Sequence, residues 1–169
     1  MRVSRRPTLG MTEGMQMTPL SQDITNVLPS LRRYGRAVTG DRHTGDRYIL
    51  VALEILSAEP WRIRPGQDVK FRLYKLFDGV LSIFEPGPLK DVDRADPYHR
   101  LRCRVLDLPL VSRKLLLLVM LERFSVARAA ELLGLPEREA EIHLVGARAQ
   151  LTSALGNTDG LRTSHKQAA

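Results

Sequence analysis

Histidines and aspartates are the residues of this chain best suited to chemistry, because they can serve as metal ligands or as general acids and bases. The four histidines lie in four different segments, and no two have the spacing of metal ligands: His43, His99, His143 and His165. The candidate aspartates lie where loops and helix caps are expected: Asp41, Asp46, Asp91, Asp93 and Asp96. We therefore expect no metal site, no cofactor and no catalytic residue. No group of side chains in the sequence supports a third alternative, a small helical enzyme.

The composition limits which partners and which cellular compartment the protein can have. The 169 residues carry 26 Lys and Arg against 19 Asp and Glu, and this net charge of +7 favours nucleic acid, a membrane surface or an acidic protein. The single Cys103 excludes an internal disulfide. The longest apolar run, Leu115 to Leu121, is far shorter than the roughly 20 residues of a membrane span. We expect a cytoplasmic protein without membrane contact.

A helix-turn-helix is the clearest pattern in the chain. Ala129 and Ala130 are small residues where two helices would cross, and Gly134 suits the turn between them. The second helix opens with three glutamates within its first two turns: Glu137, Glu139 and Glu141. A DNA-reading helix places these positions against phosphates, which carboxylates repel. The glutamates favour the helix dipole instead, so we expect no DNA contact from this helix.

Apolar residues at helical spacing predict an all-α fold of two small three-helix units without a β-sheet. The units are expected over residues 21–85 and 106–156. Residues 86–105 are rich in proline and charge and predict an interdomain linker. Residues 1–20 and 157–169 have no apolar period and predict a flexible leader and a flexible tail.

The individual helices follow from the same spacing and from cap residues. They are expected over residues 21–39, 46–58 and 68–84 in the first unit and over 112–123, 126–133 and 136–155 in the second. Ser21 or Asp23 is the predicted cap of the first helix, and Ser112 is that of the fourth. Pro29 should kink the first helix or mark its start.

Two blocks resemble a known family. LPSLRRYGRAVTGDRHTGDRYILVALEIL, from Leu28 to Leu56, resembles the opening of the sigma-like domain of the PhyR family. These proteins are response regulators of the general stress response in alphaproteobacteria. The Leu-Pro-x-Leu-Arg-Arg-Tyr run, the Thr39-Gly40 turn and the Gly45-Asp46-x-Tyr48 start carry the likeness. LPLVSRKLLLLVMLERFSVARAAELLGLP resembles the region 4-like part, so that the match covers roughly residues 22–155.

The resemblance implies a mechanism of partner switching. A region 2-like and a region 4-like unit together mimic an extracytoplasmic-function (ECF) sigma factor. The mimic captures the small anti-sigma protein NepR and so releases the real sigma factor to RNA polymerase. This function is that of an anti-anti-sigma factor and needs neither catalysis nor DNA contact. The alternative is a genuine ECF sigma factor that binds core polymerase and promoter DNA, which the net charge of +7 and the helix-turn-helix favour.

Members of the family also carry a receiver domain after the sigma-like part, and this chain has none. In the family, phosphorylation of a receiver aspartate exposes the sigma-like surface. We therefore expect either a fragment or a receiver-less relative. In both cases the chain should bind the anti-sigma protein constitutively, because no lid covers the binding groove.

The expected groove lies between the two units, where an amphipathic helix of the partner would lay its apolar face. Six apolar residues are the predicted partner contacts: Ile49, Leu53, Leu56, Leu117, Leu121 and Phe124. Ordinary core packing is the alternative for each of them. The run from Leu115 to Leu121 is apolar on too many faces for a helix with one buried side, which indicates contact with a partner or with the other unit.

Overall fold

A computed structural model describes residues 18–64, 66–84 and 97–163 of the chain, with side chains for 18–64, 66–84 and 101–153. Within these ranges the protein is all-α and contains no strand, as predicted. Most of the expected leader, residues 86–96 of the expected linker and the last residues of the expected tail lie outside the described residues. None of the described helices is both long enough and apolar enough to cross a membrane.

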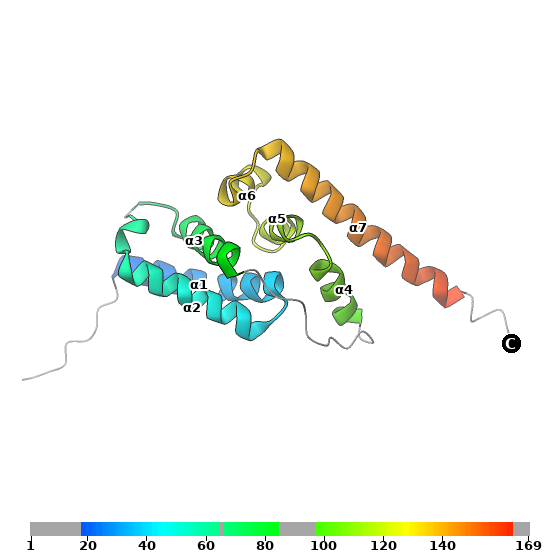
Figure 1. Cartoon of the computed structure of the whole chain (residues 1–169), viewed down its shortest axis with the longest axis horizontal. Coiled ribbons are helices and arrows are strands. Elements are labelled where there is room, and N and C mark those ends of the chain that lie inside the picture. Colours follow the sequence, from blue (N-terminus) through cyan, green and yellow to red (C-terminus); the bar gives the residue numbers. More distant parts are fainter. Residues whose placement is uncertain (1–17, 65, 85–96, 164–169) are drawn as a thin grey trace, which may run out of the picture.

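Three helices form the N-terminal lobe: α1 (Pro19–Thr39), α2 (Arg42–Ala58) and α3 (Val69–Phe84). A short 3-10 turn, η1 (Pro60–Arg62), connects α2 to α3 (Figure 1). Four helices form the C-terminal lobe: α4 (Pro97–Leu106), α5 (Leu110–Met120), α6 (Val126–Leu133) and α7 (Glu137–Thr163). The first predicted unit, 21–85, thus contains α1 to α3, and the second predicted unit, which begins at residue 106, contains α5 to α7, whereas α4 lies almost entirely in the expected linker.

The first two helices of the N-terminal lobe begin earlier than predicted, and their caps show why. Thr18, rather than Ser21 or Asp23, caps α1, and its hydroxyl accepts a hydrogen bond from the backbone N–H of Ser21. The Asp41 carboxylate accepts one from the N–H of Thr44 at 2.7 Å, so α2 begins at residue 42 rather than 46. The helix α1 runs through Pro29 as one element.

The expected linker contains a helix. Residues 97–105, predicted as linker because of their charge and prolines, form α4 together with Leu106, and α4 contacts α1 and α7. The Arg102 guanidinium donates to the carbonyl of Gly40 at the end of α1, and Leu106 is buried. The charge of this segment predicted a solvated loop, but one of its arginines, Arg102, binds the N-terminal lobe.

The predicted helix-turn-helix is confirmed in α6 and α7. Ser125 caps α6 by accepting from the N–H of Arg128, and Gly134 ends it with a φ of 69°. This left-handed conformation favours glycine. The predicted cap Ser112 is wrong: α5 begins at residue 110, and the Ser112 hydroxyl lies 3.0 Å from Nδ1 of His143 in α7. The last helix also continues to Thr163, beyond the predicted end at residue 155.

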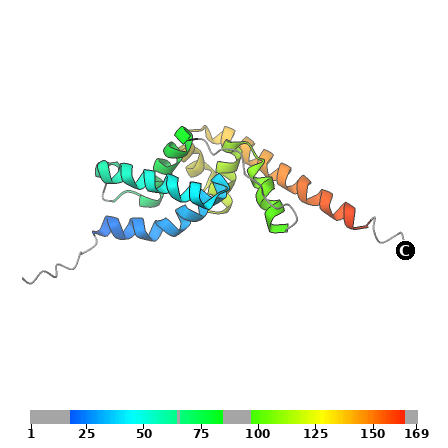
Figure 2. The same cartoon turned by 60° about the horizontal axis from the view of Figure 1, so that its bottom comes forward.

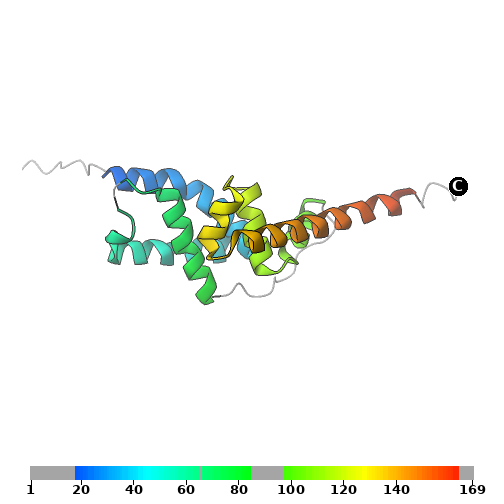
Figure 3. The same ribbon diagram turned by 90° about the horizontal axis from the view of Figure 1, so that it is seen from above.

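One hydrophobic core joins the two lobes. Tyr34, Tyr74 and Phe77 fill the N-terminal lobe, and the same cluster continues into Leu115 and Leu118 of α5. A smaller cluster lies between α5 and α7 and is formed by Leu108, Leu116, Leu144 and Ala147. Figures 2 and 3 show α5 and α6 against the N-terminal lobe, while α7 extends away from it. The apolar run of α5 therefore has two buried faces because it packs against both the other lobe and α7.

The close crossing of α1 and α2 depends on two glycines. A Cβ atom on Gly45 would lie 2.8 Å from the carbonyl carbon of Gly35 and 2.9 Å from the nitrogen of Arg36. Both are backbone atoms of α1, so a side chain can be accommodated only if the two helices move apart.

We predict that Gly45→Ala lowers the free energy of unfolding by about 2 kcal/mol, the usual effect of overpacking a well-packed site. Urea unfolding followed by circular dichroism measures it. Gly79→Ala in α3 is the matched control, because no atom lies within 4 Å of the added Cβ. It should leave stability unchanged or raise it by roughly 0.5–1 kcal/mol, since alanine favours a helix. Equal stability of the two variants would show that the crossing tolerates a side chain.

Candidate partner-binding surface

The six residues predicted to line an open groove lie within the shared core. Ile49, Leu56 and Leu117 are buried, whereas the others are partly buried and pack against the same cluster: Leu53, Leu121 and Phe124. The Phe124 ring packs edge-on against Tyr74 with ring centroids 5.4 Å apart. The prediction of an open groove at these positions is therefore wrong, because side chains of the two lobes fill it. Direct contact of these residues with a partner stays a prediction.

A buried carboxylate, that of Glu122, lies at the centre of the lobe interface. Its Oε1 accepts hydrogen bonds from Nε and Nη2 of Arg33 in α1, at 3.1 and 2.9 Å. Its Oε2 accepts one from the Tyr74 hydroxyl in α3 at 2.7 Å. Lys70 Nζ donates to the backbone carbonyl of Glu122 at 2.8 Å and lies 3.7 Å from Oε2. The side chain is 0% exposed, so the N-terminal lobe supplies all the partners that this charge requires.

Tyr74 is held in its donor form. Burial raises the pKa of its hydroxyl well above the ordinary value, and the hydrogen bond to the Glu122 carboxylate raises it further. The phenol therefore stays protonated over the physiological pH range and remains a donor to the carboxylate.

Other charged pairs cross the same interface. Lys114 Nζ lies 2.7 Å from Oδ1 of Asp78, and both side chains are largely buried. Arg128 of α6 pairs with Asp68, the residue before α3, with Nη2 2.9 Å from Oδ2. Its guanidinium carbon lies 3.8 Å from the centre of the Phe71 ring. Several charges of the C-terminal lobe are thus paired with the other lobe.

Exposed apolar side chains gather on the outer face of α7. Ile142 and Val145, one turn apart, are 66% and 67% exposed. Met120 at the end of α5 is 53% exposed, and its sulfur lies 3.4 Å from Nη2 of Arg148 on the next turn of α7. We call Met120, Ile142 and Val145 the α7 patch. The inner face of α7 is formed by different residues: Ala140, Leu144 and Ala147.

The α7 patch was not among the residues predicted from the sequence, and it can be recognised only once the buried positions of α7 are known. Buried positions 140, 144 and 147 follow a helical period, and Ile142 and Val145 lie outside that period. Glu137, Glu139 and Glu141, the glutamates expected to prevent DNA contact, are exposed near the patch on the same helix. The helix that would read DNA in a helix-turn-helix protein thus presents carboxylates and aliphatic groups.

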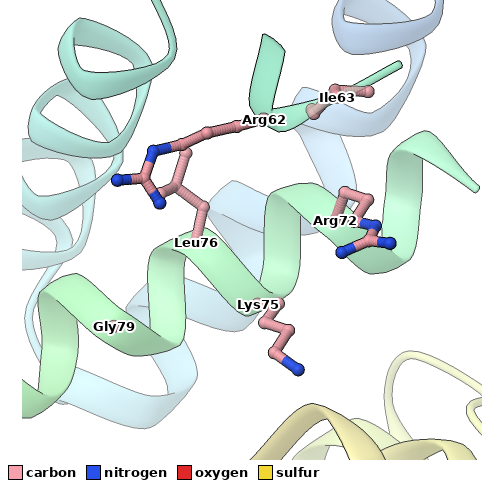
Figure 4. A pocket seen from close by; sticks show the side chains of 6 residues that line it. All are labelled: Arg62, Ile63, Arg72, Lys75, Leu76 and Gly79. Carbon is pink, nitrogen blue, oxygen red and sulfur yellow. The ribbon is translucent and has the colours of Figure 1, made fainter. Parts of the chain in front are cut away.

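A basic hollow lies on the N-terminal lobe (Figure 4). Its volume is about 390 Å³, and six residues line it: Arg62, Ile63, Arg72, Lys75, Leu76 and Gly79. A second hollow of about 360 Å³ on α1 and the start of α2 is lined by Pro29, Arg32, Arg33, Arg36 and Arg42. Both would attract carboxylates or phosphates.

The two histidines whose side chains the structure describes, His43 and His143, lie in different helices, α2 and α7. His43 is exposed in the first turn of α2, whereas Nε2 of His143 lies 3.8 Å from a Glu139 carboxylate oxygen on its own helix. The side chains of His99 and His165 lie outside the described ones. Among the residues that the structure describes, no three His, Cys, Asp or Glu side chains form a group that could hold a metal ion.

Comparison with known proteins places this arrangement, a helix-turn-helix packed against a three-helix lobe, in the class of sigma-factor-like proteins. Residues 24–78 match the family model for the Sigma2 domain of PhyR. The phyllosphere-induced regulator PhyR of Methylorubrum extorquens is 32% identical over 114 residues, which cover 67% of this chain and 42% of that protein. The chain therefore spans less than half the length of this curated relative.

Solved structures extend the likeness to both lobes. The PhyRSL–NepR complex from Sphingomonas sp. Fr1 matches with a TM-score of 0.67 and 32% identity, covering 81% of this chain and 88% of that chain. The chain belongs to the PhyR family and corresponds to its sigma-like domain.

PhyR from Bartonella quintana has been solved in two states. Complexed with the anti-sigma factor NepR, it matches with a TM-score of 0.63 and 25% identity over 79% of this chain and 49% of that chain. Without NepR it matches with a TM-score of 0.54 and 28% identity, covering 77% of this chain and 46% of that chain.

We predict that Leu121→Asp lowers thermal stability and helix content together. Leu121 is partly buried in the shared core beside Glu122, and a charge placed there should cost about 2 kcal/mol or more. Thermal unfolding followed by circular dichroism at 222 nm provides the measurement. The adjacent Met120→Asp is the control, since Met120 is exposed, and it should unfold like the wild type. Retained stability in Leu121→Asp would instead support direct partner contact at this residue.

Proposed function

We propose that this chain is an anti-anti-sigma factor of the general stress response. It mimics an ECF sigma factor, binds a NepR-type anti-sigma protein and so releases the sigma factor for RNA polymerase. The likeness to the PhyRSL–NepR complex, which extends over both lobes at 32% identity, carries this proposal. The mechanism is an exchange of binding partners in the cytoplasm, without a catalytic step, a cofactor or DNA contact.

The α7 patch is the surface that we assign to the partner. An exposed aliphatic side chain gains roughly 1.5–3 kcal/mol when a protein surface covers it. Ile142 and Val145 have the spacing that an amphipathic helix of the partner can cover along one face of α7. The neighbouring glutamates favour a partner with basic residues beside its apolar face and disfavour a phosphate backbone.

The second candidate function is a genuine ECF sigma factor. The basic hollow around Arg62, Arg72 and Lys75 favours it, because these three cations can contact DNA phosphates. Run-off transcription with core polymerase and a gel shift with promoter DNA test this function. Specific transcription, with DNA affinity that falls steeply as salt rises, would establish the sigma factor and overturn the anti-anti-sigma factor.

We predict that the chain, without phosphorylation, binds a NepR-type protein with a dissociation constant of about 1 μM or below, which corresponds to roughly −8 kcal/mol. Isothermal titration calorimetry measures it. The double variant Ile142→Asp/Val145→Asp should weaken binding by at least about 10-fold, because two carboxylates replace the aliphatic contact. Its thermal unfolding should match the wild type, since both side chains are exposed.

Thr152→Asp serves as the matched control, because Thr152 is exposed on the same helix and outside the α7 patch. It should bind like the wild type. Absence of binding by the wild-type chain would refute the function, whereas wild-type affinity in the double variant would refute only the assignment of the surface.

A further inference from the structure

The charged contacts between the lobes differ in how far their side chains are shielded from solvent. The Arg128 and Asp68 side chains are 40% and 52% exposed, so water competes for that pair. Glu122 is fully enclosed and receives donors from two different helices of the N-terminal lobe. Of the acidic side chains described in the C-terminal lobe, it is the one whose position depends most on the other lobe.

The geometry of Glu122 restricts how the lobes can be arranged. Apolar contacts in the shared core are non-directional and tolerate small rotations of one lobe against the other. Hydrogen bonds from Arg33 to one carboxylate oxygen and from Tyr74 to the other fix direction as well as distance. A rotation of the lobes would withdraw these donors and leave a buried charge without partners.

The C-terminal end of α5 places the carboxylate with little freedom. The backbone N–H groups of Leu121 and Glu122 both donate to the carbonyl of Leu117, at 2.9 and 3.1 Å. Arg123 follows with a φ of 62°, a left-handed conformation that turns the chain toward α6. Glu122 is thus held at a rigid turn, and its position follows that of the whole C-terminal lobe.

The geometry points to Glu122 as a positioning residue that holds the two lobes, before the partner arrives, in the arrangement that captures the anti-sigma protein. This inference rests on the proposed function.

A positioning role has a kinetic signature. If only a fraction of the molecules has the competent arrangement, the apparent dissociation constant rises by the inverse of that fraction. Loss of the Glu122 contacts should therefore slow association, because fewer molecules are competent at the moment of encounter. Dissociation should be unchanged, because the partner contacts in the complex are the same.

The test uses Glu122→Gln, which keeps the shape of the side chain and removes its charge. Stopped-flow binding to the NepR-type protein should show an association rate reduced about 10-fold, as expected when roughly a tenth of the molecules stays competent, and an unchanged dissociation rate. Small-angle X-ray scattering of the free variant should show a larger radius of gyration than the wild type. Glu131→Gln is the matched control, because Glu131 is exposed and pairs with Arg128 of its own helix. It should behave like the wild type in both measurements.

A second variant covers the case in which Glu122→Gln does not fold. Arg33→Met removes the donors to Oε1 from a side chain that is 56% exposed, so the fold should persist and the same loss of association rate should appear. An unchanged radius of gyration and association rate in the folded variant would overturn the inference, as would an effect confined to the dissociation rate. If the wild-type chain binds no NepR-type protein, the proposed function fails, while scattering from the variants still decides whether Glu122 holds the lobes together.

Discussion

A buried carboxylate must have hydrogen-bond donors, and Glu122 of the C-terminal lobe takes its side-chain donors from the N-terminal lobe. Removing one partner of such a buried pair typically costs about 3–5 kcal/mol, because the remaining charge stays desolvated. The shared apolar core supplies attraction between the lobes, whereas the carboxylate adds direction. The relative placement of every surface on the two lobes, including the α7 patch and the basic hollows, depends on this contact.

Contacts between the lobes show why the net charge of the C-terminal lobe says little about its surface. Residues 106–155 carry equal numbers of acidic and basic residues, which the sequence alone reads as a neutral unit. In the structure, Lys114, Glu122 and Arg128 are paired with the other lobe, and the exposed front of α7 is dominated by acidic side chains. Net charge therefore describes such a unit poorly, because it does not distinguish charges that hold the lobes from charges that face a partner.

Local features were predictable from the sequence, whereas contacts between distant segments were not. The helix at Val126–Leu133 and its end at Gly134 follow from helical spacing and from a φ that favours glycine, and both depend on neighbouring residues. The helix α4 was missed because its charged residues suggested a solvated loop, and the partner of Arg102 lies in α1, far away in the chain. The run from Leu115 to Leu121 indicated contact with a partner or with the other unit, and only the structure shows that α5 packs against both the N-terminal lobe and α7. The candidate site was the least predictable part, since Ile142 and Val145 look like ordinary core residues until the inner face of α7 is known.

The packing of α7 shows how a DNA-reading scaffold can serve protein recognition. Small or compact residues at positions 140, 144 and 147 fix the helix against the rest of its lobe, and the geometry of the turn depends on Gly134. The outer face contributes little to folding, so its residues can change without loss of the fold. Basic residues on that face would bind phosphates, whereas the aliphatic and acidic residues present here favour a protein surface. In this chain the inner face of α7 therefore serves the fold, and its outer face is free to meet a partner.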